Sequence, residues 1–322
     1  MLPRLLQEML GIDLPIVGGT MMDMATPEFV GAISEAGALG IIASAMYQNE
    51  DSFRTAIKRT KEITEKPIGV NINLFPSMKK LDHFRYLDIM REEGVGIVET
   101  SGYAPPEDLV ARIEDLGLKW MHKCVGVRYA LKADSLGADA VTVVGYENGG
   151  ATGILNVTTL VLVPRTVDAV SIPVIGGGGV VDGRTLAAMF CLGASAAIVG
   201  TRLMLSEECP VHQNVKDRLL DADEMDTDVI MRSVGFAHRV WMNEASTKAA
   251  EIEARGGSLE EIYPHVSGSA TREMIHDGRL DIGSLSVSQG IGLVTDIKPV
   301  AEILDEMMEE AESVLASLGA GA

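Results

Sequence analysis

Pro173-Val-Ile-Gly-Gly-Gly-Gly-Val-Val-Asp-Gly183, followed by Gly193-Ala-Ser-Ala-Ala-Ile-Val-Gly-Thr201, is the stretch that decides the fold. It reads as an apolar strand, a glycine turn, a helix, a second apolar strand and a second glycine turn. Glycine lets the backbone approach a ligand closely, and free N–H groups at such turns bind phosphate. In (β/α)8 barrels the loops after the seventh and eighth strands form the usual phosphate site. This stretch therefore predicts a barrel that binds a phosphate-containing cofactor.

Length and composition are typical of one barrel with an appendage. The 322 residues exceed the ~250 of a common (β/α)8 barrel. Hydrophobic residues make up 47% of the chain, beside 34 glycines, which fits a buried parallel sheet with many tight turns. The net charge of −19 disfavours nucleic acid and membrane surfaces as partners, because both attract basic patches. Local N–H groups and a few cations must therefore hold any anionic cofactor.

The expected compartment is the cytoplasm. The cysteines Cys124, Cys191 and Cys209 form no Cys-x-x-Cys pair, and their odd number argues against a disulfide framework. Residues 1–10 are too few and too charged for a signal peptide. No apolar run reaches the ~18–20 residues of a membrane span. The oligomeric state stays open, and a homodimer is compatible with the sequence.

Eight apolar segments alternate with helical patterns. Such alternation indicates a parallel sheet, and eight repeats form a closed barrel more often than an open sheet. The expected strands cover residues 14–17, 39–43, 67–71, 96–99, 119–123, 138–144, 173–175 and 194–199. The expected helices cover residues 27–36, 50–64, 79–93, 106–116, 127–136, 158–170 and 183–192.

Beyond Thr201 the pattern changes. Residues 207–276 are polar, rich in methionine and helical in pattern, with no convincing strand. Residues 296–318 form an amphipathic pattern, which predicts one helix that closes the barrel wall. We therefore expect an α/β (β/α)8 barrel at 1–206, a helical insertion or lid after the eighth strand at 207–285, and a return segment with the C-terminal helix at 286–322.

Two strand ends carry candidate binding residues, because barrel active sites lie at the C-terminal ends of the strands. Lys123 ends the apolar fifth strand. It is either a cation that contacts an anionic ligand or a lysine that extends from the barrel rim into solvent. Asn71 and Asn73 end the third strand. Asparagine is a poor strand residue, so ligand binding is favoured over capping of the next turn.

The sixth strand leads into Tyr146-Glu-Asn-Gly-Gly-Ala-Thr-Gly153, a longer turn than a plain βα loop requires. It either lines the active site or shields the barrel mouth. Glu147 offers a general base, although a lone glutamate at a rim is more often solvated or capping. The six histidines show no metal-binding spacing, so no metal site is predicted. We expect His122 to point into the barrel wall, because its neighbour Lys123 points the other way.

These motifs, in this order, resemble the nitronate monooxygenase family of FMN-dependent (β/α)8 barrels, which includes flavin-dependent enoyl-thioester reductases and NADH:quinone reductases. The resemblance covers nearly the whole chain and is specific, because many matches occur in one order. It rests on residues 15–21, 69–71, 122–128, 137–141, 178–183, 200–202, 208–212 and 288–292.

The resemblance implies an FMN site at the barrel mouth. Gly19, Thr20 and Met21 would lie along the isoalloxazine ring, and Asn71 and Lys123 would contact the flavin. The glycine turns would hold the phosphate, with the sixth loop and the return segment closing over the site. The residues implied for these roles are Gly149, Gly150, Gly178, Gly179, Gly200, Thr201, Gln289 and Gly290.

One position departs from the family pattern. Family members usually carry Gly-Gly-His or Ala-Gly-His in the sixth loop, and that histidine is the expected acid/base of nitronate oxidation. Here the loop reads Asn148-Gly-Gly-Ala151, and alanine cannot transfer a proton. General acid/base groups supply ~10²–10⁴-fold in rate. Hydride transfer belongs to the flavin and needs mainly positioning, so flavin chemistry is still expected.

The sequence thus predicts an FMN-bound oxidoreductase. NADH or NADPH would give a hydride to the flavin, which would pass it to an activated C=C, an acyl thioester or a quinone. An acyl-CoA thioester suits a lid that clamps a long ligand. The candidate proton donors are Tyr146, Glu147, His122 and His265.

Three alternatives stay open. One is nitronate monooxygenation with oxygen, using a substitute for the missing histidine. Another is a flavin-binding protein without catalysis, which Ala151 suggests but the retained phosphate-turn glycines oppose. The third is an FMN-free barrel that uses the two glycine turns to bind a sugar phosphate or a nucleotide phosphate. It would need an inward catalytic lysine or carboxylate pair, and only Lys123 and Glu147 are available.

Overall fold

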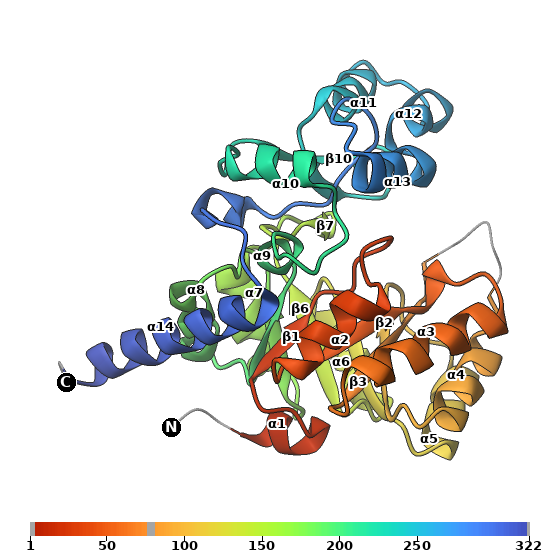
Figure 1. The fold of residues 1–322 in the computed structure, drawn as a ribbon, viewed down its shortest axis with the longest axis vertical. Helices are drawn as coiled ribbons and strands as arrows, with labels where there is room; N and C mark the ends of the chain where they lie inside the picture. The colour runs from red at the N-terminus through yellow and green to blue at the C-terminus, as the bar shows by residue number, and fades with distance from the viewer. Residues whose placement is uncertain (1–3, 76–80, 321–322) are drawn as a thin grey trace.

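Eight parallel strands form a nearly closed barrel in the lower half of the molecule as drawn (Figure 1). The computed structural model describes residues 4–75 and 81–320. The strand order is β1-β9-β8-β6-β5-β4-β3-β2, and a bridge between Val17 and Leu39 joins the two end strands. The predicted (β/α)8 class is confirmed. The barrel strands are β1 (Ile16–Gly18), β2 (Gly40–Ala43), β3 (Ile68–Asn73), β4 (Ile97–Ser101), β5 (Lys119–Cys124), β6 (Ala140–Val144), β8 (Val174–Gly177) and β9 (Ala196–Val199).

Helices surround the barrel and bury the outer faces of its strands. Thr26, Asn49, Asp82 and Asp182 each accept a backbone N–H at a helix start, which explains where four of these helices begin. Residues 79–80 of one expected helix lie outside the described residues. The surrounding helices are α2 (Pro27–Glu35), α3 (Glu50–Ile63), α4 (His83–Glu92), α5 (Glu107–Asp115), α6 (Val127–Ser135), α7 (Thr159–Val167) and α8 (Gly183–Cys191).

The N-terminal end of the barrel is closed by α1 (Leu5–Leu10). Leu6 and Leu10 are buried and belong to the same apolar cluster as the inward side chains Ile41 and Met121. Figure 1 shows α1 below the barrel, opposite the segments that follow β9. Because this end is filled, a ligand can enter the barrel only from the C-terminal ends of the strands.

The last helix completes the barrel wall. α14 (Val300–Ala320) packs mainly against α8 and also contacts α2. The Glu310 carboxylate accepts a hydrogen bond of 2.7 Å from Gly183 N at the start of α8. The helix begins four residues later than the expected 296, because Lys298 forms an extended bridge with Ser206. Among the described residues, no helix combines the length and apolar character needed to cross a membrane.

The insertion after β9 contains strands, so the expectation of a purely helical segment is wrong. β10 (Thr227–Ile230) and β11 (His238–Trp241) pair antiparallel, and β11 also pairs with β7 (Gly150–Ala151) from the sixth loop. Four-residue strands carry little periodicity of their own, and the partner strand β7 is distant in sequence. The rest of the insertion is helical: α9 (Thr201–Met204), α10 (Gln213–Leu220), α11 (Glu244–Ala254), α12 (Leu259–Val266) and α13 (Gly268–Asp277).

Candidate active site

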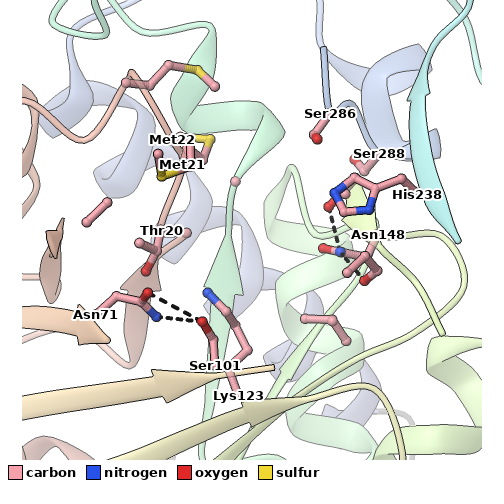
Figure 2. Close-up of a pocket in the computed structure, with 18 of the residues that line it drawn as sticks. Thr20, Met21, Met22, Asn71, Ser101, Lys123, Asn148, His238, Ser286 and Ser288 are labelled. Carbon is pink, nitrogen blue, oxygen red and sulfur yellow. Dashed lines mark hydrogen bonds between the residues drawn. The ribbon is translucent and has the colours of Figure 1, made fainter. Parts of the chain in front are cut away.

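A cavity of about 500 Å³ lies at the C-terminal ends of the barrel strands. The barrel supplies one part of its wall, and the sixth loop, β11, α13 and the segment before η2 (Gln289–Leu293) supply the other. Figure 2 shows the two sides, with Met21, Asn71 and Lys123 facing Asn148 and His238 across the open space. The cavity is therefore shared between the barrel and its insertion.

The glycine turns after β8 and β9 line this cavity with bare backbone. Gly178 and Gly179 adopt φ of 110° and 75°, a left-handed backbone that favours glycine. A Cβ added at Gly200 would meet no atom within 4 Å, so open space lies beside this turn. Within the described residues, the N–H groups of Gly178, Gly179, Gly200 and Thr201 find no backbone carbonyl as partner. These unpartnered donors form a site suited to a phosphate.

A buried carboxylate organises the polar floor of the cavity. Glu99 is fully buried, and its Oε1 accepts hydrogen bonds from Thr20 Oγ1 at 2.8 Å, Asn71 Nδ2 at 2.6 Å and Lys123 Nζ at 3.0 Å. Strand register explains the grouping, because Asn71 lies opposite Glu99 and Lys123 lies opposite Ser101 one layer nearer the mouth. The ion pair fixes the Lys123 ammonium at the cavity wall, which agrees with the binding alternative for this lysine rather than with extension into solvent.

Close backbone packing shapes the sixth loop. A Cβ on Gly149 would lie 2.8 Å from the Val287 carbonyl carbon, so only glycine fits between the loop and the return segment. The Asn148 side-chain amide donates to the carbonyls of Gly149 and Ala151, at 2.6 and 3.3 Å. The loop is thus held rigidly, with Gly149, Gly150 and Ala151 on the cavity wall.

Eleven of the thirteen residues implied for the cofactor line the cavity. The two exceptions are Gln289, whose N–H donates to Glu147 O, and Gly290, which packs behind the Gly179 turn. A Cβ on Gly290 would lie 2.9 Å from Gly179 O, so Gly290 packs closely against the Gly178–Gly179 turn from outside the cavity. The eleven are Gly19, Thr20, Met21, Asn71, Lys123, Gly149, Gly150, Gly178, Gly179, Gly200 and Thr201.

None of the four candidate proton donors lines the cavity. His122 is fully buried outside the barrel, where Nδ1 lies 2.8 Å from Thr100 Oγ1, and burial lowers its pKa to about 4. Its side chain alternates with the inward Lys123, as expected. The Glu147 carboxylate caps α7 through Thr159 N and Oγ1, at 2.9 and 2.8 Å.

The other two candidates are also held elsewhere. The Tyr146 ring lies beneath the guanidinium groups of Arg232 and Arg239, at 5.7 and 4.5 Å from its centroid. His265 lies on α12, away from the cavity. The structure thus places none of these four side chains on the cavity wall, and their role in proton transfer stays a prediction.

The cavity is lined by polar side chains that the sequence analysis did not identify as candidates. His238 on β11, Arg272 on α13, and Ser286 and Ser288 before η2 all line it. Ser288 Oγ is buried and has no hydrogen-bond partner among the described residues. Glu99 on β4, which organises the polar floor, is likewise marked by no sequence motif. No local motif marks these residues, because their positions depend on the folding of the insertion over the barrel.

The residues present fit FMN. Four unpartnered N–H groups beside the open space at Gly200 suit a phosphate. Lys123 offers hydrogen-bond donors to a polar ring edge, because Glu99 engages only one of its three N–H groups. The Asn71 amide beside it already donates to Glu99 and Ser101, and Ser288 Oγ offers an unpartnered group. This fold and site define the class of (β/α)8-barrel proteins with a ligand cavity at the C-terminal ends of the strands.

The chain belongs to the nitronate monooxygenase family, whose model matches residues 4–310. It is accordingly an oxidoreductase, and the resemblance inferred from the sequence is confirmed. Two curated relatives are named (3aS,4S,5R,7aS)-5-hydroxy-7a-methyl-1-oxo-octahydro-1H-indene-4-carboxyl-CoA dehydrogenase. The protein from Rhodococcus jostii is 31% identical, with 98% of this chain and 97% of the relative covered. The protein from Mycobacterium tuberculosis is 37% identical, with 85% and 77% covered.

The structure is also similar to that of FabK from Thermotoga maritima. The TM-score is 0.91 at 33% sequence identity, and the match covers 98% of each chain. The insertion and the C-terminal helix are therefore included in the shared architecture.

Proposed function

We propose that this protein binds FMN and uses NADH or NADPH to reduce an activated C=C in an acyl thioester. The observation that carries the proposal is a single cavity that combines unpartnered turn N–H groups with the buried Lys123–Glu99 pair. The bound flavin would supply the two-electron chemistry, accepting a hydride from the nicotinamide and passing it to the double bond. The protein supplies binding and orientation.

Each part of the wall has a role in this proposal. The turns at Gly178–Gly179 and Gly200–Thr201 hold the phosphate through their backbone N–H groups. Such local donors are needed because the chain's net negative charge repels an anionic cofactor. Lys123 donates to the ring edge, and Glu99 keeps its ammonium in place. One Lys123 donor is used by Glu99, so the others remain for the ligand.

An acyl-CoA thioester is favoured over a quinone as acceptor. Both curated relatives carry an acyl-CoA in their names and share 31% and 37% identity with this chain. At the cavity, Arg272 forms an ion pair of 3.0 Å with Asp23 and keeps a half-exposed guanidinium. Such a cation suits the phosphates of a CoA nucleotide.

Nitronate monooxygenation is the second candidate, because it is the activity in the family name. Ala151 weighs against it, since a methyl group occupies the position of the expected acid/base in the sixth loop. Glu147 in the same loop is not placed to substitute, because its carboxylate caps α7 through Oε2 and does not line the cavity.

The test is a visible spectrum of the purified protein, followed without oxygen. A flavin band bleached by NADH or NADPH and restored by an enoyl-CoA supports the proposal. Restoration by a quinone such as menadione, but not by the thioester, would exclude the preferred acceptor. A band that only a nitronate bleaches would favour monooxygenation. Bleaching by no donor would leave a flavin-binding protein without catalysis. Absence of a band, even after FMN is added, would refute the cofactor assignment.

A further inference from the structure

We propose that His238 is the proton-transfer residue of this active site and stands in for the histidine that the sixth loop lacks. The inference rests on the proposed function, because it assigns the proton that accompanies hydride transfer. It is carried by the placement of His238 in the small antiparallel sheet above the barrel mouth.

Strand register places His238 directly opposite Ala151. β11 pairs with β7 so that His238 faces Ala151 and Arg239 faces Gly150. In an antiparallel pair, opposite residues extend from the same face of the sheet, with Cβ atoms about 5 Å apart. Both residues line the cavity. An imidazole at position 238 therefore extends into the space that a side chain at position 151 would use.

The surroundings leave room for this ring and do not engage it. A Cβ on Gly150 would lie 3.9 Å from His238 Nε2, so the missing side chain opens the space beside that nitrogen. Ala151 contributes only a methyl group. Over residues 4–75 and 81–320, neither ring nitrogen of His238 has a hydrogen-bond partner. Figure 2 shows the ring beside Ser286 and Ser288, across the cavity from Lys123. A free imidazole in a cavity wall is available to a ligand.

The charges around the cavity let the ring change its protonation state. The charged side chains that line the cavity are Asp23, Lys123 and Arg272. Asp23 pairs with Arg272, and Lys123 pairs with the buried Glu99. Arg239, next to His238, turns away and donates to Tyr146 O and Thr227. Burial lowers the pKa of His238 below its ordinary value, with no charged partner opposing it. The ring is therefore mainly neutral at neutral pH.

The chemistry needs one such group. Reduction of a C=C conjugated with a thioester adds a hydride to the β carbon and a proton to the α carbon. His238 first takes up a proton from solvent. A ring nitrogen of the imidazolium then gives that proton to the α carbon, which returns the ring to neutral imidazole. In the reverse direction, neutral His238 removes the α proton while the β hydride leaves to the cofactor. Among the described acidic, basic and histidine side chains that line the cavity, His238 is the one not already committed to an ion pair. The Cys124 thiol also lines it, but burial raises the pKa of that thiol.

The first experiment measures the ring itself. Imidazole NMR signals of the FMN-free protein are assigned by comparison with the His238→Asn variant, then followed while FMN is added and while pH is changed. We expect the His238 signal to shift on FMN binding and its titration midpoint to lie below the ordinary histidine value. A signal that is unaffected by FMN would overturn the proposal, whatever reaction the enzyme catalyses.

The second experiment moves the histidine. In His238→Asn, reduction of an octenoyl-CoA by NADH should fall by about 10²–10⁴-fold, while the flavin band and its bleaching by NADH stay unchanged. Ala151→His in the same chain should recover about tenfold or more, because the imidazole returns to the facing position. The matched control is His83→Asn on α4, outside the cavity. If His238→Asn turns over at the wild-type rate, the proposal is wrong. If the wild type reduces no enoyl-CoA, the proposed function fails instead, and the NMR result still decides the role of His238.

Discussion

Gly200→Ala separates cofactor binding from folding. Gly200 has a negative φ of −113°, outside the left-handed region that favours glycine, and its new Cβ would meet no protein atom within 4 Å. Glycine-to-alanine changes at compatible positions alter stability by only about 0.4–1 kcal/mol, usually upward. The added methyl group instead enters the open space beside the free N–H groups of Gly200 and Thr201. It therefore obstructs a phosphate without disturbing the fold.

The size of the effect follows from the donors at this turn. A hydrogen bond to a charged group contributes about 1.5–3 kcal/mol, so losing one bond from Gly200 N or Thr201 N weakens FMN binding about tenfold to a hundredfold. Gly200→Val should weaken it further. The assay is quenching of FMN fluorescence on titration with protein, with urea unfolding of the FMN-free protein alongside.

A comparison variant tests the reasoning. Gly178→Ala places a Cβ 2.4 Å from Thr159 Oγ1 at φ of 110°, so it should lower the free energy of unfolding as well as FMN affinity. If Gly200→Ala and Gly200→Val both bind FMN as tightly as the wild type, the β9 turn does not hold the phosphate. The proposed binding of phosphate by the N–H groups of Gly200 and Thr201 would then be refuted.

Three further predictions follow from single contacts. Glu99→Leu should lower the free energy of unfolding by about 3–5 kcal/mol in urea, because it leaves Lys123 without its buried partner; adding Lys123→Met should recover part of the loss, and a double variant no more stable than the single one would contradict this. Arg272→Ala should raise the KM for an enoyl-CoA more than for the matching pantetheine thioester, and equal changes would exclude a contact with the nucleotide phosphates. The free energy of unfolding should fall by about 3 kcal/mol between pH 6.5 and pH 4, because His122, with a pKa of about 4 when folded, is protonated first in the unfolded chain. His122→Phe should make the free energy of unfolding depend less on pH in this range. An unchanged pH dependence would assign the effect to other groups.

Much of the barrel could be predicted because its signals are local. Each strand is a short apolar run, and each helix has its own periodicity and cap, such as Asn49 at α3 or Asp182 at α8. The glycine turns at Gly178 and Gly200 follow strands that are adjacent in the barrel, so sequence order alone brought them together. Alternation along β5 correctly placed Lys123 inward and His122 outward.

The sequence by itself determined the barrel, its mouth, the glycine turns after β8 and β9, and the absence of a histidine at Ala151. Each depends on residues near one another along the chain or on a family pattern. Only the tertiary structure decided what surrounds Ala151. The pairing of β11 with β7 joins segments that are far apart in sequence. Both strands are too short to give a recognisable periodic pattern. That pairing brings His238 to the cavity, whereas capping of α7 removes Glu147 from it. Side-chain roles at this site are set by contacts between distant segments, which no local pattern contains.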